Sequence, residues 1–184
     1  MKKLLFIVIG LVVFFGFAVL FLYNSLISAN EAINQQWAQV ETQYQRRYDL
    51  IPNLVESVKG AMAQEQTIFM GLAEARTRYG NAATVDDKIA AANQVETQLG
   101  RLLVVLENYP QLTSTETVQT LMAQLEGTEN RISVERKKYN EAIQSFNVKI
   151  KRFPDNLIAQ MLGFKERAYF QAVSGAEQVP QVNF

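Results

Sequence analysis

The run of nineteen uncharged residues from Leu4 to Leu22 limits what this chain can fold into more than any other feature. As an α-helix this run is about 28 Å long, close to the thickness of the hydrocarbon core of a bilayer. A helix that is apolar on every side has to be buried in lipid or in a large protein core. We therefore expect residues 4–23 to span a membrane and to contact the lipid bilayer directly.

A cleaved signal peptide is the alternative for the same residues, because the small side chain of Ala29 would suit a cleavage site. Such signals usually have an apolar core of about 7–15 residues, and the longer run here favours a retained anchor. Lys2 and Lys3 precede the run, and the next basic residue is Arg46. The positive-inside rule then predicts a single-pass protein with a cytoplasmic N-terminus. In a bacterium the membrane would be the inner (cytoplasmic) one. Residues 1–3 would be cytoplasmic, and the remainder periplasmic or extracellular.

Charge and composition argue against several classes of function. Eighteen basic residues balance eighteen acidic ones, so no basic surface is expected for nucleic acid. The chain has no cysteine and no histidine. It therefore lacks thiol nucleophiles, disulfides, the commonest general base and the commonest transition-metal ligand. We expect a protein that is not an enzyme and has no catalytic residues, no cofactor and no metal site.

Beyond residue 23 the apolar residues recur at intervals of three and four, which is the period of an amphipathic helix. One such stripe runs from Ile33 to Tyr79, and Thr84 with Asp87 marks the start of another helix. Short connections favour antiparallel neighbours. The fold class is therefore all-α, with the transmembrane helix continuing into a long helix of an antiparallel bundle over residues 24–175. The expected helices cover residues 24–79, 85–109, 114–153 and 156–172, and residues 176–184 form an extended tail.

Pro52 interrupts the first long stripe, because it has no amide hydrogen and crowds the carbonyl group of Tyr48. Two interpretations follow: a kink within one helix, or a tight turn between two helices. The stripe crosses Pro52 in register, which favours the kink. Arg47 lies at the edge of the apolar face, where an interhelical hydrogen bond is expected. Thr128 and Glu135 lie on the inward row of the helix over 114–153.

Three segments resemble the pattern of the LemA family: "YNSLISANEAINQQW", "RRYDLIPNLVESVKG" and "ENRISVERKKYNEAIQSFNVKIKRFPDNLIAQMLGF". The resemblance extends to the terminal "VPQVNF". It implies a bacterial membrane-anchored helical bundle without an established catalytic activity. It also implies a structural or interaction motif, which is made up of Arg47, Asp49, Pro52, Asn53, Arg136, Tyr139, Asn140, Asn147 and Pro154.

Two functions compete on this basis. The first is a non-catalytic scaffold or adaptor of the cell envelope that forms a homo-oligomer. It is suggested by aromatic residues outside the main stripe, namely Phe69, Phe164, Tyr169 and Phe170, although these could equally close the core. The second is a regulatory subunit or signal-transmitting partner of a membrane protease or receptor, which would make an envelope membrane protein the partner.

Acidic residues give little support to an enzyme. Asp86 and Asp87 stand at a helix start, where carboxylates favour the helix dipole. Glu126 and Glu129 lie three apart on one helix face, near Arg131, and ordinary ion pairing explains them better than a metal site. A small-molecule pocket between helices stays open as a possibility.

Overall fold

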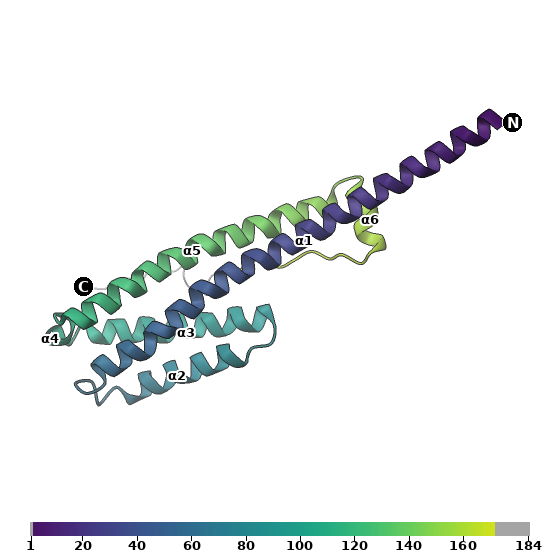
Figure 1. Cartoon of the computed structure of the whole chain (residues 1–184). Helices are drawn as coiled ribbons and strands as arrows, with labels where there is room; N and C mark the ends of the chain where they lie inside the picture. Colours follow the sequence, from purple (N-terminus) through teal and green to yellow (C-terminus); the bar gives the residue numbers. More distant parts are fainter. Residues whose placement is uncertain (1, 172–184) are drawn as a thin grey trace, which may run out of the picture. The chain divides into compact units, whose positions relative to one another are not determined.

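A computed structural model describes residues 2–171, and every regular element within that range is a helix (Figure 1). The all-α fold class is therefore confirmed. The helices are α1 (Lys2–Val58), α2 (Gln66–Asn81), α3 (Val85–Leu106), α4 (Pro110–Thr113), α5 (Glu116–Lys151) and α6 (Asp155–Met161). Two compact units share α1 and α5. The α6 unit contains residues 2–40 and 135–169. The four-helix unit, named for its four longer helical segments from α1, α2, α3 and α5, contains residues 41–134 with 170–171 and also includes the four-residue α4.

The first part of α1 is largely exposed among the described residues. Within the described residues it is the one helix long and apolar enough to cross a membrane, and none of its most apolar window is buried. Phe14 and Phe17 are more than two-thirds exposed. Full burial begins only at Leu26, one turn after the apolar run. Residues 2–171 therefore provide no core for residues 4–21.

In the α6 unit, the stripe of α1 packs against the C-terminal half of α5. Leu26, Ile33 and Trp37 are buried on α1. The Trp37 and Tyr139 rings lie with their centroids 5.5 Å apart. Nearer the apolar run, Lys149 Nζ donates to the backbone carbonyl of Ser25 at 3.2 Å and to the Ser25 hydroxyl. Because residue numbers fall along α1 as they rise along α5, the two helices run antiparallel.

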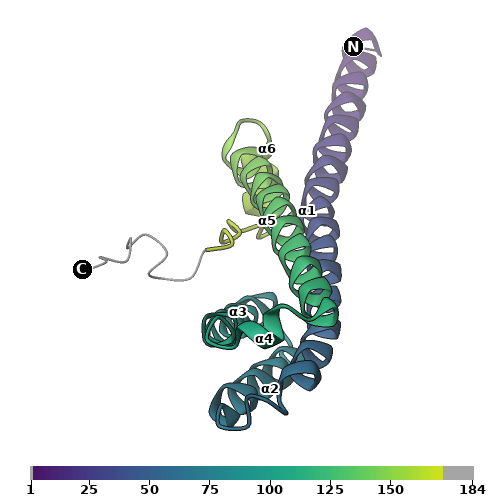
Figure 2. The ribbon, with the colours of Figure 1, turned by 90° about the vertical axis from the view of Figure 1, so that its left-hand side faces the viewer.

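In the four-helix unit, α2 and α3 form a hairpin (Figure 2). The end of α1 contacts it through Tyr48, which meets Tyr79 of α2, and through Arg47, which meets Glu96 of α3. Thr84 caps α3, because its hydroxyl oxygen accepts a hydrogen bond from the Asp87 amide at 3.1 Å. This confirms the predicted start of that helix. The core is made of apolar side chains at helical spacing, among them Ile51, Leu54, Leu72, Val95, Leu102, Leu121 and Leu125.

The expected helix over residues 24–79 is in fact two helices, because α1 ends at Val58 and α2 begins at Gln66. Gly60, which has a low helix propensity, stands in the turn. The Met62 amide still donates to the Val58 carbonyl at 3.0 Å, and the Met62 side chain is fully buried. Burial therefore keeps a helical period through the turn, so the apolar pattern alone does not reveal the break.

Pro52 lies inside α1, which continues for six residues beyond it. The chain therefore does not reverse at Pro52, and the interpretation of one helix crossing this residue is confirmed. The reversal comes after Val58 instead.

The expected helix over residues 156–172 is shorter in the structure, where α6 ends at Met161. Gly163 has a φ of 73°, and the Phe164 amide donates to the Ala159 carbonyl at 2.9 Å. This is the Schellman arrangement that ends helices with glycine in the left-handed region. Residues 164–171 then form an irregular segment. The predicted tail, residues 176–184, lies outside the described residues.

Replacing Gly163 with alanine should lower the free energy of unfolding by about 1 kcal/mol, because a Cβ disfavours the left-handed conformation. Gly127 is a matched control, since it lies inside α5 with open space around its Cα. Gly127→Ala should instead stabilise the protein by about 0.5–1 kcal/mol. Thermal unfolding of the detergent-solubilised chain, followed by circular dichroism, measures both. Two changes of the same sign would contradict the role given to Gly163.

Candidate functional site

Arg47 is the most completely buried charged side chain among the described residues, with 2% of its surface exposed. It projects from α1 into the four-helix unit, between α3 and α5. Its Nε donates to Thr128 Oγ1 at 3.4 Å, and Thr128 in turn donates to the Leu125 carbonyl at 2.7 Å. The interhelical hydrogen bond expected for Arg47 is therefore present.

Two carboxylates from different helices neutralise this guanidinium. Nη1 lies 3.5 Å from Glu96 Oε1 on α3, and Nη2 donates to Glu129 Oε2 on α5. The Glu96 side chain is 19% exposed and that of Glu129 is 52% exposed. Partial burial keeps the Glu96 pair less screened by solvent than the Glu129 pair. With all three nitrogen atoms engaged, Arg47 holds helices together and has little capacity left to bind a substrate anion.

Three tyrosines lie next to Arg47 in the four-helix unit. The Tyr44 and Tyr48 rings are stacked with centroids 5.9 Å apart, and the Tyr79 ring stands edge-on to Tyr48 at 4.5 Å. Burial, reinforced by the neighbouring Tyr79 and Tyr44, raises the pKa of the Tyr48 phenol above its usual value. Burial also raises the pKa of Tyr79, with a further contribution from Glu41. Both phenols are therefore poor general bases near neutral pH.

A cavity of about 620 Å³ opens beside Arg47 between α3 and α5. Half of its ten lining side chains are apolar, namely Leu99, Leu103, Met122, Ala123 and Leu125. Arg47, Glu126 and Glu129 supply charge. This is a pocket between helices of the kind that the sequence left open. No cluster of three or more carboxylates that could bind a metal ion occurs among residues 2–171.

Asn147 makes the second buried polar contact, in the α6 unit. Its Nδ2 donates to the Arg167 carbonyl and its Oδ1 accepts from the Arg167 amide, each at 2.9 Å. The Arg167 side chain then donates to Asn30 Oδ1 on α1 at 2.9 Å. The Asn147 side chain therefore satisfies the backbone N–H and C=O groups of Arg167, as a neighbouring strand would. The Arg167 side chain then attaches the irregular segment to α1.

The remaining motif residues lie in different surroundings. Asp49 is exposed and accepts from Gln45 Nε2 at 2.8 Å, and the carbonyl of exposed Asn53 accepts from Ser57 at 2.7 Å. Tyr139 is buried against Trp37. The others occupy partly or fully exposed positions: Pro52, Arg136 and Asn140 are half-buried, and Pro154 is exposed. The nine residues thus do not form one site.

Sequence reasoning missed Glu96, which carries one of the two charges opposite Arg47. A signal for it was available, since Glu96 lies directly after Val95 and three residues before Leu99, both of them core positions. An acidic residue at the edge of an apolar stripe suggests a basic partner on a neighbouring helix. The pattern does not say which helix supplies that partner.

Comparison with known proteins gives a consistent result. The sequence model described as the LemA family matches residues 36–184. The chain belongs to the LemA family. Residues of this family region include Arg47, Tyr139 and Asn147, and the match begins after the apolar run.

Three relatives are similar over most of this LemA-family chain. Magnetosome protein MamQ 2 of Paramagnetospirillum magneticum is 30% identical over 87% of the chain and 68% of its own length. Magnetosome protein MamQ of Magnetospirillum gryphiswaldense is 27% identical, over 80% of the chain and 64% of its own length. Protein LemA of Metamycoplasma hominis is 24% identical, over 81% of the chain and 68% of its own length. None of these names specifies a reaction.

Arg47→Ala should lower the free energy of unfolding by about 3 kcal/mol, because it leaves Glu96 partly buried without its cation. Arg46 is an adjacent control, since it is exposed, and Arg46→Ala should change stability by less than about 0.5 kcal/mol. Chemical denaturation of the full chain in detergent measures the difference. Equal changes in the free energy of unfolding for the two substitutions would contradict the stabilising role of the Arg47 contacts.

Tyr48→Phe should stabilise the protein by about 1 kcal/mol at neutral pH, because the buried Tyr48 hydroxyl has no hydrogen-bond partner among the described residues. In the unfolded chain the Tyr48 phenol loses its proton near pH 10. In the folded chain the raised pKa keeps the phenol protonated to higher pH. Stability therefore falls as the pH rises above about 10, and Tyr48→Phe should lessen that fall. Tyr169→Phe, at an exposed position, is the control. Identical stability–pH curves for the two variants would contradict the prediction.

Proposed function

We propose that this chain is a non-catalytic scaffold or adaptor of the bacterial cell envelope, anchored in the inner membrane by residues 4–23. The observation that carries the proposal is the unburied apolar run at the start of α1. Leucine, isoleucine, phenylalanine and valine each favour the bilayer centre by about 0.3–0.6 kcal/mol. Over the whole run, the free energy of insertion therefore favours the bilayer over water by several kcal/mol.

Contacts just after the run support a retained anchor over a cleaved signal. Cleavage after Ala29 would remove Leu26, which is fully buried, and Ser25, which accepts hydrogen bonds from Lys149. It would also leave Asn30, which accepts from Arg167, as the first residue. A signal peptide is usually separated from the mature fold, whereas these residues are part of it.

The polar sites support a structural role. Arg47 and Asn147 both use their hydrogen-bonding groups to join segments of the fold. The family and its named relatives provide no reaction to assign. The proposed orientation places the N-terminus in the cytoplasm and the bundle on the opposite side, following the lysines before the run.

Self-association stays a prediction. Of the aromatic residues that suggested it, Phe170 is buried and Phe164 packs edge-on against Phe146 at 5.9 Å. Phe69 is half-buried, and Tyr169 is exposed. The core-closing interpretation therefore accounts for most of them. Sedimentation of the purified chain in detergent tests the oligomer, and a monomer at high concentration would remove it.

Membrane attachment is tested by two arginines in the apolar run. Val12→Arg with Phe15→Arg should release the protein from alkaline-washed membranes, because each charge costs about 2.5–3.5 kcal/mol near the bilayer centre. The matched control, Val104→Arg with Val134→Arg, places the same charges on two exposed positions of the bundle and should leave the protein in the pellet. A double variant in the run that stays in the membrane would contradict the anchor.

Orientation is tested in the same cells. The chain has no cysteine, so Lys137→Cys provides a unique thiol at an exposed position of α5. A membrane-impermeant maleimide should label it in spheroplasts. Labelling only after lysis would show the reverse orientation.

A further inference from the structure

The α6 unit carries an exposed apolar surface that its own core does not use. We call it the α6 face, and it consists of Phe153, Leu157, Met161 and Leu162. Phe153 is 79% exposed and Met161 is 82% exposed. Side chains of this kind, adjacent in the chain and open to solvent, usually mark a contact with a partner or a membrane.

The orientation of α6 follows from its residue spacing. Ala159 is the buried residue of α6. Leu157 and Met161 each stand two positions from Ala159, about 200° around the helix axis. These two residues lie one turn apart on the side opposite to Ala159. The helix thus buries Ala159 and presents Leu157 and Met161 outward, while Ile158 is half-buried.

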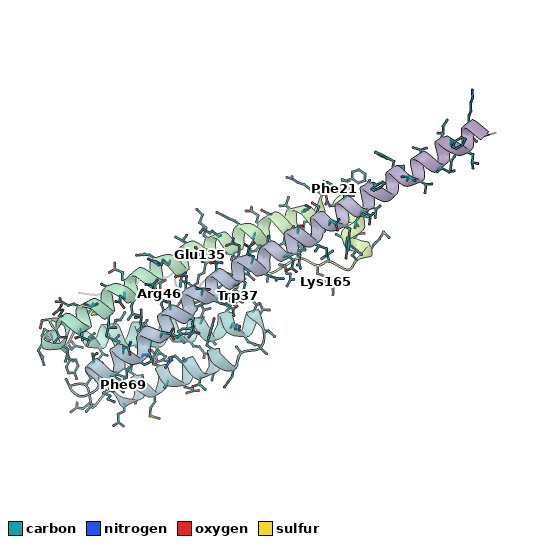
Figure 3. All side chains as sticks on the ribbon, in the orientation of Figure 1. Phe21, Trp37, Arg46, Phe69, Glu135 and Lys165 are labelled. Atoms are coloured by element: carbon teal, nitrogen blue, oxygen red, sulfur yellow. The ribbon has the colours of Figure 1, made fainter. Side chains whose placement is uncertain are left out.

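Two contacts place the α6 face at the end of the apolar run. Before α6, Lys149 binds Ser25, and after it Arg167 binds Asn30. Ser25 is only three residues beyond Leu22, or about 4.5 Å along α1. Because α5 runs antiparallel to α1, its last two residues after Lys149 continue toward the apolar run. Figure 3 shows the turn and α6 near the labelled Phe21.

Basic residues flank the α6 face in the chain. Residues 149–167 include five basic and two acidic side chains. Glu166 is already paired with Lys151 at 2.8 Å. The basic residues are Lys149, Lys151, Arg152, Lys165 and Arg167. Apolar side chains flanked by lysine and arginine are typical of segments that lie in the headgroup region of an anionic bilayer.

We propose that the α6 face is a second membrane contact, lying in the interfacial region of the bilayer that α1 crosses. Phe153, Leu157 and Met161 enter the boundary between headgroups and acyl chains, and the basic residues contact anionic phospholipid headgroups. This inference rests on the proposed membrane anchor. A bilayer fits this surface better than a second copy of the chain, because the surface adjoins the apolar run and carries an excess of positive charge that two copies would bring together.

The test measures depth in the bilayer with one fluorescent label at a time. Because the chain has no cysteine, Met161→Cys, Phe14→Cys and Lys137→Cys each introduce a unique thiol for an environment-sensitive fluorophore. The full-length protein is placed in nanodiscs of phosphatidylglycerol and phosphatidylcholine that contain lipids with a spin label on the acyl chain. Phe14 reports the anchor, and Lys137 is an exposed control on α5.

Lipid quenching should reduce the emission at positions 14 and 161 by at least about twofold and leave position 137 unchanged. Quenching at position 14 without quenching at position 161 would overturn the α6 contact while the anchor stands. Absence of quenching at position 14 would overturn the anchor and the α6 contact together. A label at 161 that is shielded from aqueous iodide, yet not quenched by lipid, would identify a protein contact instead.

The electrostatic part has its own comparison. Quenching at position 161 should weaken in nanodiscs of phosphatidylcholine alone, and also when Arg152→Glu and Lys165→Glu are combined in the anionic nanodiscs. Lys137→Glu with Lys138→Glu is the matched control, because it reverses two exposed charges on α5, more than ten residues before the α6 face. Equal quenching in all these cases would overturn the role of the basic residues.

Discussion

A single helix, α1, has to satisfy two different surroundings, and the rest of the structure depends on how it does so. Its first turns are apolar on every side, and its later turns are apolar along one stripe. The hydrophobic effect drives both parts out of water, but a stripe can be covered by neighbouring helices, whereas an apolar cylinder cannot be covered by a bundle of this size. The protein core therefore starts at Leu26, where polar residues begin to occupy the opposite face.

Within the four-helix unit, apolar packing alone leaves the choice of helix neighbours weakly specified, because leucine and valine pack against almost any similar surface. The Arg47 contacts add direction, since one guanidinium has to meet Thr128, Glu96 and Glu129 at the same time. A sliding of α3 or α5 by one turn would leave a buried charge without its partners. We regard this requirement as the main reason for an arginine at a position that could otherwise hold a leucine.

Much of the fold was predictable from the sequence, because helical periodicity and capping are local properties. The apolar run, the stripe through Pro52 and the Thr84 cap were all read from short segments. The break after Val58 was not, since Met62 is buried in the position that a continuous helix would give it. The end of α6 was also missed, although Gly163 signals it, because the apolar residues continue beyond the glycine to Phe164 and Phe170.

The candidate site was less predictable for a different reason. The spacing placed Arg47 at the edge of an apolar face and Thr128 on an inward row, but the partners of a buried charge come from other helices. Glu96 is 49 positions from Arg47 along the chain, and no local pattern relates the two. The family resemblance named Arg47 and Asn147, which contact other segments of the chain, together with Asp49 and Asn53, whose hydrogen bonds to Gln45 and Ser57 lie within about one turn of α1.

The contacts that close the α6 unit also determine what it exposes. Gly163 turns the chain back, Asn147 holds the Arg167 backbone, and the Arg167 side chain reaches Asn30. With both ends of α6 held in this way, its small residue, Ala159, faces the protein, and Leu157 and Met161 face outward. A soluble protein would gain stability from the opposite arrangement, in which Met161 and Leu157 were buried. That the fold is closed with these residues outside is most simply explained by a second apolar environment beside the anchor.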